Sequence, residues 1–217
     1  PTPTPIPATV PAPVPAPTPT ACTADAIGST GYSLVFKGCS AANVAEYYDK
    51  TECVRDNATG LIWQGHEAGY TGLRSAWIGR TNFDNINALQ VWKGTASGPI
   101  GQRIAADYRA PLLSEIDATS NSIGFKNAIN ASNLCGSGTW RMPTKNELLS
   151  LTGSYDQVWF PNTRDDANDA YWSSTPYTLD SGNDTAYAVN IQSGYAGIYT
   201  SRGEGTTINN LRVRLVR

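Results

Sequence analysis

The sequence is poor in charged side chains, which make up 16% of its 217 residues. Acidic and basic residues nearly balance, with 18 Asp and Glu against 16 Lys and Arg, so there is no broad basic footprint and we expect no nucleic-acid partner. No apolar run approaches the roughly 18 residues that cross a bilayer, so we expect no membrane span. The abundance of Gly, Ser, Thr, Asn and Tyr is typical of a secreted, loop-rich protein.

Histidine occurs once, as His66, and this scarcity limits the catalytic chemistry open to the chain. A serine or cysteine hydrolase needs a positioned base, and the residues around His66 offer it no partner, so we expect a solvent-exposed loop residue. No phosphate-binding loop or dinucleotide fingerprint is present, and no spacing of Asp and Glu indicates a glycosidase pair. The sequence therefore predicts a non-enzymatic protein with no required cofactor.

The cysteines are Cys22, Cys39, Cys53 and Cys135, and none belongs to the Cys-x-x-Cys pairs of zinc sites. Their even number favours disulfides, and with them an oxidising, extracellular compartment. Of the three possible pairings we favour Cys22 with Cys39, which closes a local loop, and Cys53 with Cys135. Buried free thiols are the alternative.

Residues 1–20 form a separate, uncharged segment in which proline alternates with Thr, Ala, Val and Ile. Its prolines are Pro1, Pro3, Pro5, Pro7, Pro11, Pro13, Pro15, Pro17 and Pro19. Because these residues lack an amide hydrogen, we expect extended polyproline II geometry with a reach of about 60 Å at about 3.1 Å per residue. The segment is either a spacer or an assembly tail that docks in an aromatic groove of a neighbouring subunit.

The chain begins at Pro1 without a methionine or an apolar leader, so we expect that a signal peptide or a larger upstream region has been removed. Residues 21–217 are enough for one domain with a sizeable core. Their patterning predicts helices at 41–48, 83–92 and 122–134, a hairpin at 54–64, and strands at 32–36, 171–175, 185–192, 196–201 and 209–217. Gly194 is expected to turn the chain between two of these strands.

The clearest local signal lies in residues 138–149. Thr144 can cap a helix while Glu147, three residues later, reaches back to the cap amide, and Pro143 disfavours helix at Met142. A helix is therefore predicted from Thr144 to about residue 151. Helices followed by a sheet that we expect to be antiparallel give an α+β fold.

Four blocks occur in a fixed order along the chain: DNATGLIW at residues 56–63, WRMPTKNEL at 140–148, YWSST at 171–175 and VRLVR at 213–217. On these blocks, residues 53–217 resemble the bacterial Lcl C-terminal-like family, also known as domain of unknown function 1566. The sequence departs from the family pattern in two places. Residues 65–120 look like an insertion, and Met142 stands where the family commonly has Leu.

The family is similar to C-type lectin-like domains, which implies two helices packed on a twisted antiparallel sheet, with the termini close together and a long loop region. Its best-known member resembles an adhesin that binds sulfated glycosaminoglycans and forms trimers. The resemblance therefore implies a bacterial protein that recognises other molecules outside the cell.

Trp63, Trp140 and Trp172 have apolar or glycine-flanked neighbours, and indoles in such settings more often fill a core than bind a ligand. We therefore assign them a structural role. Arg141 and Glu147 are expected to pair or to bond loop carbonyls, which is also structural.

The late part of the chain is the candidate ligand-binding surface, because rigid aromatic side chains bind at low entropic cost and amides supply hydrogen bonds. Its candidate residues are Tyr177, Tyr187, Asn190, Gln192, Tyr195, Tyr199 and Arg202. Arg212 and Arg214 are expected to share one strand face, where they add anion contacts or make cross-strand pairs on a solvated sheet.

The candidate metal site is the acidic stretch that contains Asp165, Asp166 and Asp169, whose clustered oxygen atoms suit Ca²⁺. EF-hand spacing is absent, so a solvated acidic turn is the favoured alternative.

Two functions remain open. The first is a secreted or cell-surface adhesin-like module, presented on the proline-rich segment, that binds a glycan or a host or cell-surface protein. The second is a structural subunit of an extracellular filament or pilus-like polymer, in which the tail of one copy docks on the next in an open head-to-tail array. Both predict self-association through the tail.

Overall fold

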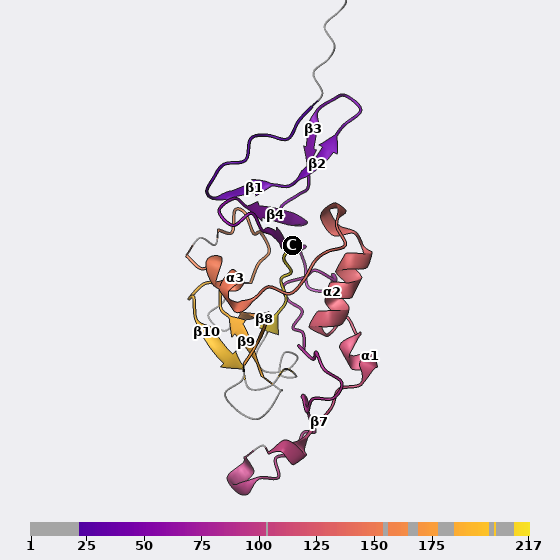
Figure 1. The fold of residues 1–217 in the computed structure, drawn as a ribbon, viewed down its shortest axis with the longest axis vertical. Coiled ribbons are helices and arrows are strands. Elements are labelled where there is room, and N and C mark those ends of the chain that lie inside the picture. The colour runs from indigo at the N-terminus through magenta and orange to yellow at the C-terminus, as the bar shows by residue number, and fades with distance from the viewer. Residues whose placement is uncertain are drawn as a thin grey trace, which may run out of the picture.

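The computed structural model describes residues 22–102, 104–153, 156–164, 169–177, 185–199, 202 and 211–217 (Figure 1). The proline-rich residues 1–20 lie outside this part of the chain. The strands are β1 (Tyr32–Leu34), β2 (Phe36–Cys39), β3 (Ala45–Tyr47), β4 (Cys53–Asp56), β5 (Ile62–Gln64), β6 (Val91–Trp92), β7 (Tyr108–Arg109), β8 (Ala170–Pro176), β9 (Ala186–Val189), β10 (Ala196–Tyr199) and β11 (Leu211–Arg212). The helices are α1 (Leu113–Ile116), α2 (Ser122–Ala131) and α3 (Lys145–Ser150). None of these helices has the length and apolarity that crossing a bilayer requires.

The fold class is α+β, with few helices and small sheets. The largest sheet has the strand order β10-β9-β8-β11, and β9 and β10 form the hairpin predicted around Gly194, whose φ of +70° suits glycine. The pairing of β11 with β8 is parallel, so the prediction of a wholly antiparallel sheet was wrong. β11 and β8 are not consecutive in the chain, because β9 and β10 come between them. No short turn therefore forces β11 to run antiparallel to β8.

A second sheet has the order β1-β4-β5. The predicted hairpin between β4 and β5 is confirmed: Gly60 donates its N–H to the carbonyl of Asp56 (2.8 Å), and the Asp56 carboxylate accepts from the amide of Ala58 (2.9 Å). The end of the chain runs along β5, since Ile62 donates to the carbonyl of Arg217 at 2.8 Å. The C-terminal residues therefore connect the two sheets.

The capped helix is confirmed in α3. The Thr144 hydroxyl accepts from the amide of Glu147 (3.2 Å), and the Glu147 carboxylate accepts from the amide of Thr144 (2.7 Å). Arg141 forms a two-pronged ion pair with the same carboxylate, at 2.5 and 2.8 Å. The expected helix at 122–134 corresponds to α2, which buries Phe125 and Ile129 one turn apart.

Two helix predictions were wrong. Residues 41–48 contain strand β3, which pairs with β2, and the positive φ of Asn43 (59°) does not fit a helix. Residues 83–92 form no α-helix, and their last two residues are strand β6, paired with β7. Here the side chain of Asn85 accepts from the amide of Asn87 (2.8 Å), which offers the backbone an alternative to helical bonds. Leu89 is 45% exposed, so no apolar helix face is buried.

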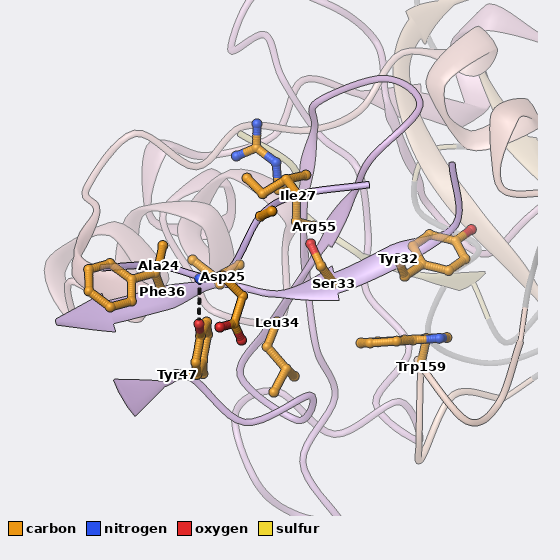
Figure 2. Close-up of a pocket in the computed structure, with 12 residues that line it drawn as sticks. Ala24, Asp25, Ile27, Tyr32, Ser33, Leu34, Phe36, Tyr47, Arg55 and Trp159 are labelled. Atoms are coloured by element: carbon orange, nitrogen blue, oxygen red, sulfur yellow. Dashed lines mark hydrogen bonds between the residues drawn. The ribbon is translucent and has the colours of Figure 1, made fainter. Parts of the chain in front are cut away.

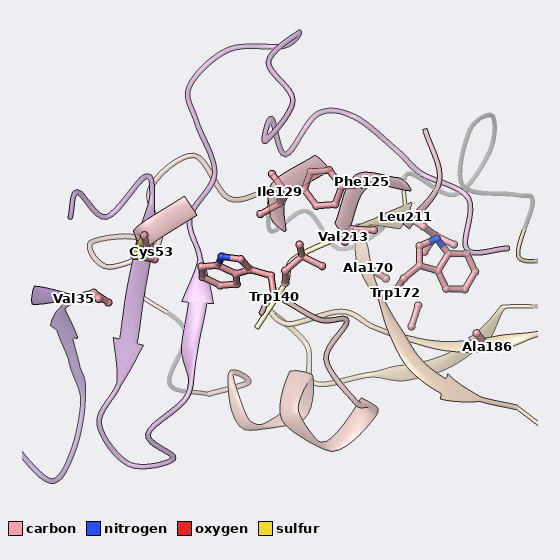
Figure 3. Close-up of a cluster of buried hydrophobic side chains, with 13 residues drawn as sticks. Val35, Cys53, Phe125, Ile129, Trp140, Ala170, Trp172, Ala186, Leu211 and Val213 are labelled. Atoms are coloured by element: carbon pink, nitrogen blue, oxygen red, sulfur yellow. A yellow bond between two sulfur atoms is a disulfide. The ribbon is translucent and has the colours of Figure 1, made fainter. Parts of the chain in front are cut away.

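The apolar interior has two clusters. The first runs from the Cys53 region under α2 to β8 and β9 (Figure 3), and it contains Trp140 and Trp172. The second contains Trp63, Leu148 and Phe160. The three tryptophans are at most 2% exposed, in agreement with their assigned structural role.

Both disulfides have the pairing favoured from the sequence. Cys22 is bonded to Cys39 with a Cα–Cα distance of 6.1 Å, and Cys53 is bonded to Cys135 at 6.5 Å. The first closes a local loop near the β2–β3 hairpin, at one end of the molecule (Figure 1). The second joins β4 to the turn after α2, and it belongs to the first apolar cluster.

Candidate functional site

Part of the predicted ligand surface is present where β8 ends and β9 begins. The rings of Tyr177 and Tyr187 meet edge to face with centroids 5.3 Å apart, and the ammonium of Lys145 lies 4.3 Å from the Tyr187 centroid. All three residues are partly exposed to solvent. This places two aromatic rings and one cation together on an accessible face, a combination suited to polar ligands.

Other predicted ligand residues are divided between surface and interior. Gln192 and Tyr195 are exposed on the turn before β10, and Tyr195 is 68% exposed. Asn190 is buried, its amide oxygen accepts from the amides of Gln192 (3.0 Å) and Ser193 (2.8 Å), and its amide nitrogen donates to the carbonyl of Asp169. The expectation for Asn190 is therefore corrected, because its polar atoms hold this turn. The side chain of Tyr199 lies outside the described structure.

Arg202 is also buried, and this corrects its assignment to a ligand surface. Its guanidinium donates to the carbonyl of Asn82 at 2.9 Å and pairs with the carboxylate of Asp84 at 2.6 Å. These bonds attach residue 202 to a segment 120 residues earlier. The arginine has an architectural role that its local sequence does not indicate.

Arg212 and Arg214 were expected on a solvated sheet, and that expectation was wrong, because each is about 1% exposed. Arg214 donates to the carbonyl of Gln64 at 2.7 Å, and its guanidinium lies 4.9 Å from the ring centroid of Phe160. Arg212 pairs with Asp169 at 3.3 Å. The long side chains cross the interior and bond groups on other segments.

Of the candidate calcium ligands, Asp165 and Asp166 lie outside the described residues. Asp169 is 2% exposed, and its carboxylate pairs with Arg164 (2.6 Å) and Arg212 (3.3 Å). Within the described part of the chain, no three His, Cys, Asp or Glu side chains gather to hold a metal. Asp169 is thus committed to two guanidinium groups, which corrects its assignment as a ligand.

His66 is 1% exposed, so the prediction of a solvent-exposed loop residue was wrong. Its Nδ1 lies 2.8 Å from the carbonyl of Arg74, which can only accept, so Nδ1 carries the proton. Burial, followed by the positive charge of Arg214, holds the pKa of His66 well below its usual 6.5. The imidazole is therefore neutral and packs beside Tyr171, with ring centroids 6.0 Å apart.

Sequence reasoning missed an open groove at the N-terminal end of the described structure (Figure 2). It has a volume of about 400 Å³ and lies between residues 24–27, strands β1 to β3 and a loop of the main body. We call it the N-terminal groove, and its larger lining side chains are Ile27, Tyr32, Phe36, Tyr47, Arg55 and Trp159. The only signal for this groove in the sequence was that large apolar or aromatic residues stand at every second position, as Tyr32, Leu34 and Phe36.

Aromatic side chains stand at both ends of the N-terminal groove (Figure 2). At one end Tyr32 and Trp159 have ring centroids 6.3 Å apart, and at the other Phe36 and Tyr47 are 5.8 Å apart. The Tyr47 hydroxyl accepts from the amide of Asp25 at 2.8 Å, which fixes the segment that forms one wall. The lining is therefore mostly apolar, with aromatic contacts at two separated points.

The described fold and its surfaces define an α+β domain with two disulfides, an aromatic groove and a second aromatic face. The sequence model of the Lcl C-terminal domain family matches residues 52–217, most of the chain, and the protein belongs to this family. No curated protein and no solved structure matches the chain. The family match begins after β3, so most of the N-terminal groove lies upstream of it and only Arg55 and Trp159 come from within it.

Proposed function

We propose that the protein is a secreted or cell-surface, non-enzymatic binding and assembly module of bacterial origin, with residues 1–20 mediating contacts between copies. Residues 21–217 would act as one domain of the C-type lectin-like class, the superfamily associated with domain of unknown function 1566. The bond between Ile62 and Arg217 supports that class, because it brings the start of the family region to its end.

The observation that carries the assembly proposal is the apolar surface at both ends of the molecule. The N-terminal groove lies at one end, and the arm that carries β6 and β7 lies at the other (Figure 1). Large apolar side chains between 37% and 105% exposed are concentrated on and around this arm: Ile86, Leu89, Trp92, Ile100, Ile104, Leu112 and Leu113. Concentrated apolar exposure of this kind marks interaction surfaces.

An extracellular location is supported by the two disulfides, which persist in oxidising compartments. The low fraction of charged residues, 16%, also fits an extracellular location. A structural subunit of an extracellular filament, with no separate ligand, is the alternative function.

Sedimentation velocity of the full chain over a range of concentrations tests the assembly proposal. The matched tail variant keeps the length of the chain but changes all nine prolines of residues 1–20 to serine, which removes the preset extended geometry. We expect oligomers that grow with concentration for the natural sequence and a single copy for the variant. Equal association of the two proteins would refute a role of the tail.

The face formed by Tyr177, Tyr187 and Lys145 favours the adhesin-like function over the purely structural one. A glycan array probed with the natural chain and with Tyr187→Ala tests it, with Tyr70→Ala as a control for loss of an exposed tyrosine outside the candidate surface. Binding that Tyr187→Ala alone weakens supports an adhesin. Absence of binding to glycans and to cell surfaces leaves the filament subunit as the function.

A further inference from the structure

The N-terminal groove has no occupant among the described residues, and its composition selects what it can hold. Its aromatic pairs are separated by the extended chain from Tyr32 in β1 to Phe36 in β2, four steps that span about 13 Å at about 3.3 Å per residue. Phe36 is 37% exposed and Ile27 is 53% exposed, so the lining is accessible. Grooves with aromatic side chains at intervals are the sites that proline-rich extended segments bind.

The chain itself contains a segment with matching chemistry. Residues 1–20 carry no charge, and proline, valine, isoleucine, alanine and threonine present a continuous apolar surface. In polyproline II geometry, about four residues at about 3.1 Å each span the distance between the aromatic pairs. Because the conformation is preset by proline, docking costs little additional chain entropy.

Cys22, the first described residue, comes two residues before the groove wall formed by residues 24–27, and this limits how a chain could fill its own groove with its tail. Cys22 is fixed by its disulfide to Cys39 and by the bond from its amide to the side chain of Asn43 (2.9 Å). Proline occupies every second position from Pro11 to Pro19, and so stiff a segment is not expected to reverse its direction within the few residues that precede Cys22. A second copy meets no such constraint.

We propose that the N-terminal groove binds residues 1–20 of a second copy of the chain, an inference that rests on the proposed role of the tail in assembly. Four docked residues leave up to sixteen as a spacer, about 50 Å at about 3.1 Å per residue. Because tail and groove are different surfaces, the contact is head to tail, and each bound copy presents its own groove to the next. The arrangement extends as a linear array unless its rotation closes a ring.

The direct test measures binding of a fluorescein-labelled peptide of residues 1–20 to the full-length tail variant, whose own tail cannot compete. Trp159→Ala and Phe36→Ala are introduced separately into that background, and Tyr70→Ala, an aromatic residue that is 68% exposed and lies outside both the groove and the arm, is the matched control. We expect fluorescence anisotropy to show saturable binding that each groove change weakens at least tenfold and the control less than twofold. Unchanged affinity in both groove variants would overturn the inference.

Assembly of the natural sequence provides the second measurement. The same groove substitutions in the natural chain are expected to abolish concentration-dependent association in sedimentation velocity, and excess free peptide is expected to do the same. Circular dichroism melts identify a variant that fails to fold, and the peptide competition then decides the question without any substitution.

The outcomes separate the two proposals. If the tail variant is a single copy while the groove variants associate normally, the tail acts at another surface, so the groove inference is wrong and the assembly function stands. If the tail variant associates like the natural chain, the assembly function fails. If the peptide binds the groove but the natural chain stays a single copy at every concentration, the groove holds its own tail, which overturns a second copy as the occupant.

Discussion

The N-terminal region, residues 22–50, and the family domain, residues 52–217, are stabilised in different ways. In the N-terminal region Val35 alone is buried, and the hairpin of β2 and β3 is joined to the preceding residues by the Cys22–Cys39 bond. The family domain has two apolar clusters and a network of buried arginines. A small region that cannot build a core needs covalent and local bonds to hold its shape.

This difference indicates that the N-terminal groove contributes mainly to binding and the interior of the family domain mainly to stability. The N-terminal region leaves aromatic side chains half exposed at the groove, while the family domain fills its interior with Trp63, Trp140 and Trp172. We therefore expect substitutions in the family domain to reduce the free energy of unfolding. Substitutions at the N-terminal groove are expected to reduce association with little change in stability.

Removing each disulfide is expected to give the largest losses of stability. Closing the 82-residue separation between Cys53 and Cys135 stabilises the fold by about 4.5 kcal/mol in the chain-entropy relation, against about 3 kcal/mol for the 17-residue separation of Cys22 and Cys39. Chemical denaturation of the two double Cys→Ala variants measures this difference. A larger loss for Cys22 and Cys39 would contradict the contrast between the regions.

Matched changes of one aspartate in each region come next. Asp169→Asn removes the carboxylate that pairs with Arg164 and Arg212 in the interior, with an expected loss of about 3 kcal/mol, because it leaves buried charge uncompensated. Asp49→Asn neutralises an exposed carboxylate that accepts from the amide of Thr51 and keeps an oxygen acceptor there, with an expected loss below about 1 kcal/mol. Urea unfolding of both variants decides the order, and equal losses would argue against a buried network as the basis of stability.

Mild acid is expected to destabilise the family domain and not the N-terminal region, because the sole histidine of the chain, His66, lies in the family domain. Its pKa is lowered in the fold, so the unfolded chain takes up the proton first and stability falls as the pH drops below about 6.5. The slope is at most about 1.4 kcal/mol per pH unit. Denaturation between pH 7 and 5 should show this slope in the natural chain and lose it in His66→Gln; an unchanged slope would assign it to other groups.

The helix cap gives the smallest effect. Hydrogen bonds from Arg141, with help from the amide of Thr144, lower the pKa of Glu147 to about 2. The ionised carboxylate therefore stabilises the fold fully above its usual pKa of 4.5, and this contribution is lost as the pH falls toward 2. Glu147→Gln should cost about 1 kcal/mol at pH 7, with allowance for solvent screening, and almost nothing near pH 2.

Thermal melts at several pH values follow the effect of Glu147→Gln. Glu46→Gln, at an exposed position of β3, is the control and should stay within about 0.5 kcal/mol throughout. A loss in Glu147→Gln that persists at pH 2 would show that the side chain acts through packing and not through its charge.

Features encoded by adjacent residues were predictable from the sequence. The cap formed by Thr144 and Glu147, the turn from Asp56 to Gly60 and the reversal at Gly194 each depend on a few residues whose backbone preferences agree. The disulfide pairing was also favoured, because one pair closes a short loop. The N-terminal groove was not predicted, since it combines β1 and β2 with Trp159, more than 120 residues away.

Other predictions failed where distant contacts overruled a local pattern. Residues 83–92 have helical apolar spacing, but no neighbouring surface covers Leu89 and local side-chain bonds satisfy the backbone instead. Arg202, Arg212 and Arg214 are buried, although their residue type is rarely found inside a protein. Their acceptors lie as far as 150 residues earlier in the chain.

The sequence by itself determined the α+β composition, the helix cap, the hairpins and the separate character of the proline-rich segment, because each depends on the dihedral and hydrogen-bonding preferences of neighbouring residues. Only the tertiary structure decided that His66 and three arginines are interior and that aromatic side chains from distant segments form a groove. Burial and shape complementarity depend on which surfaces meet in space, and residue order along the chain does not specify that.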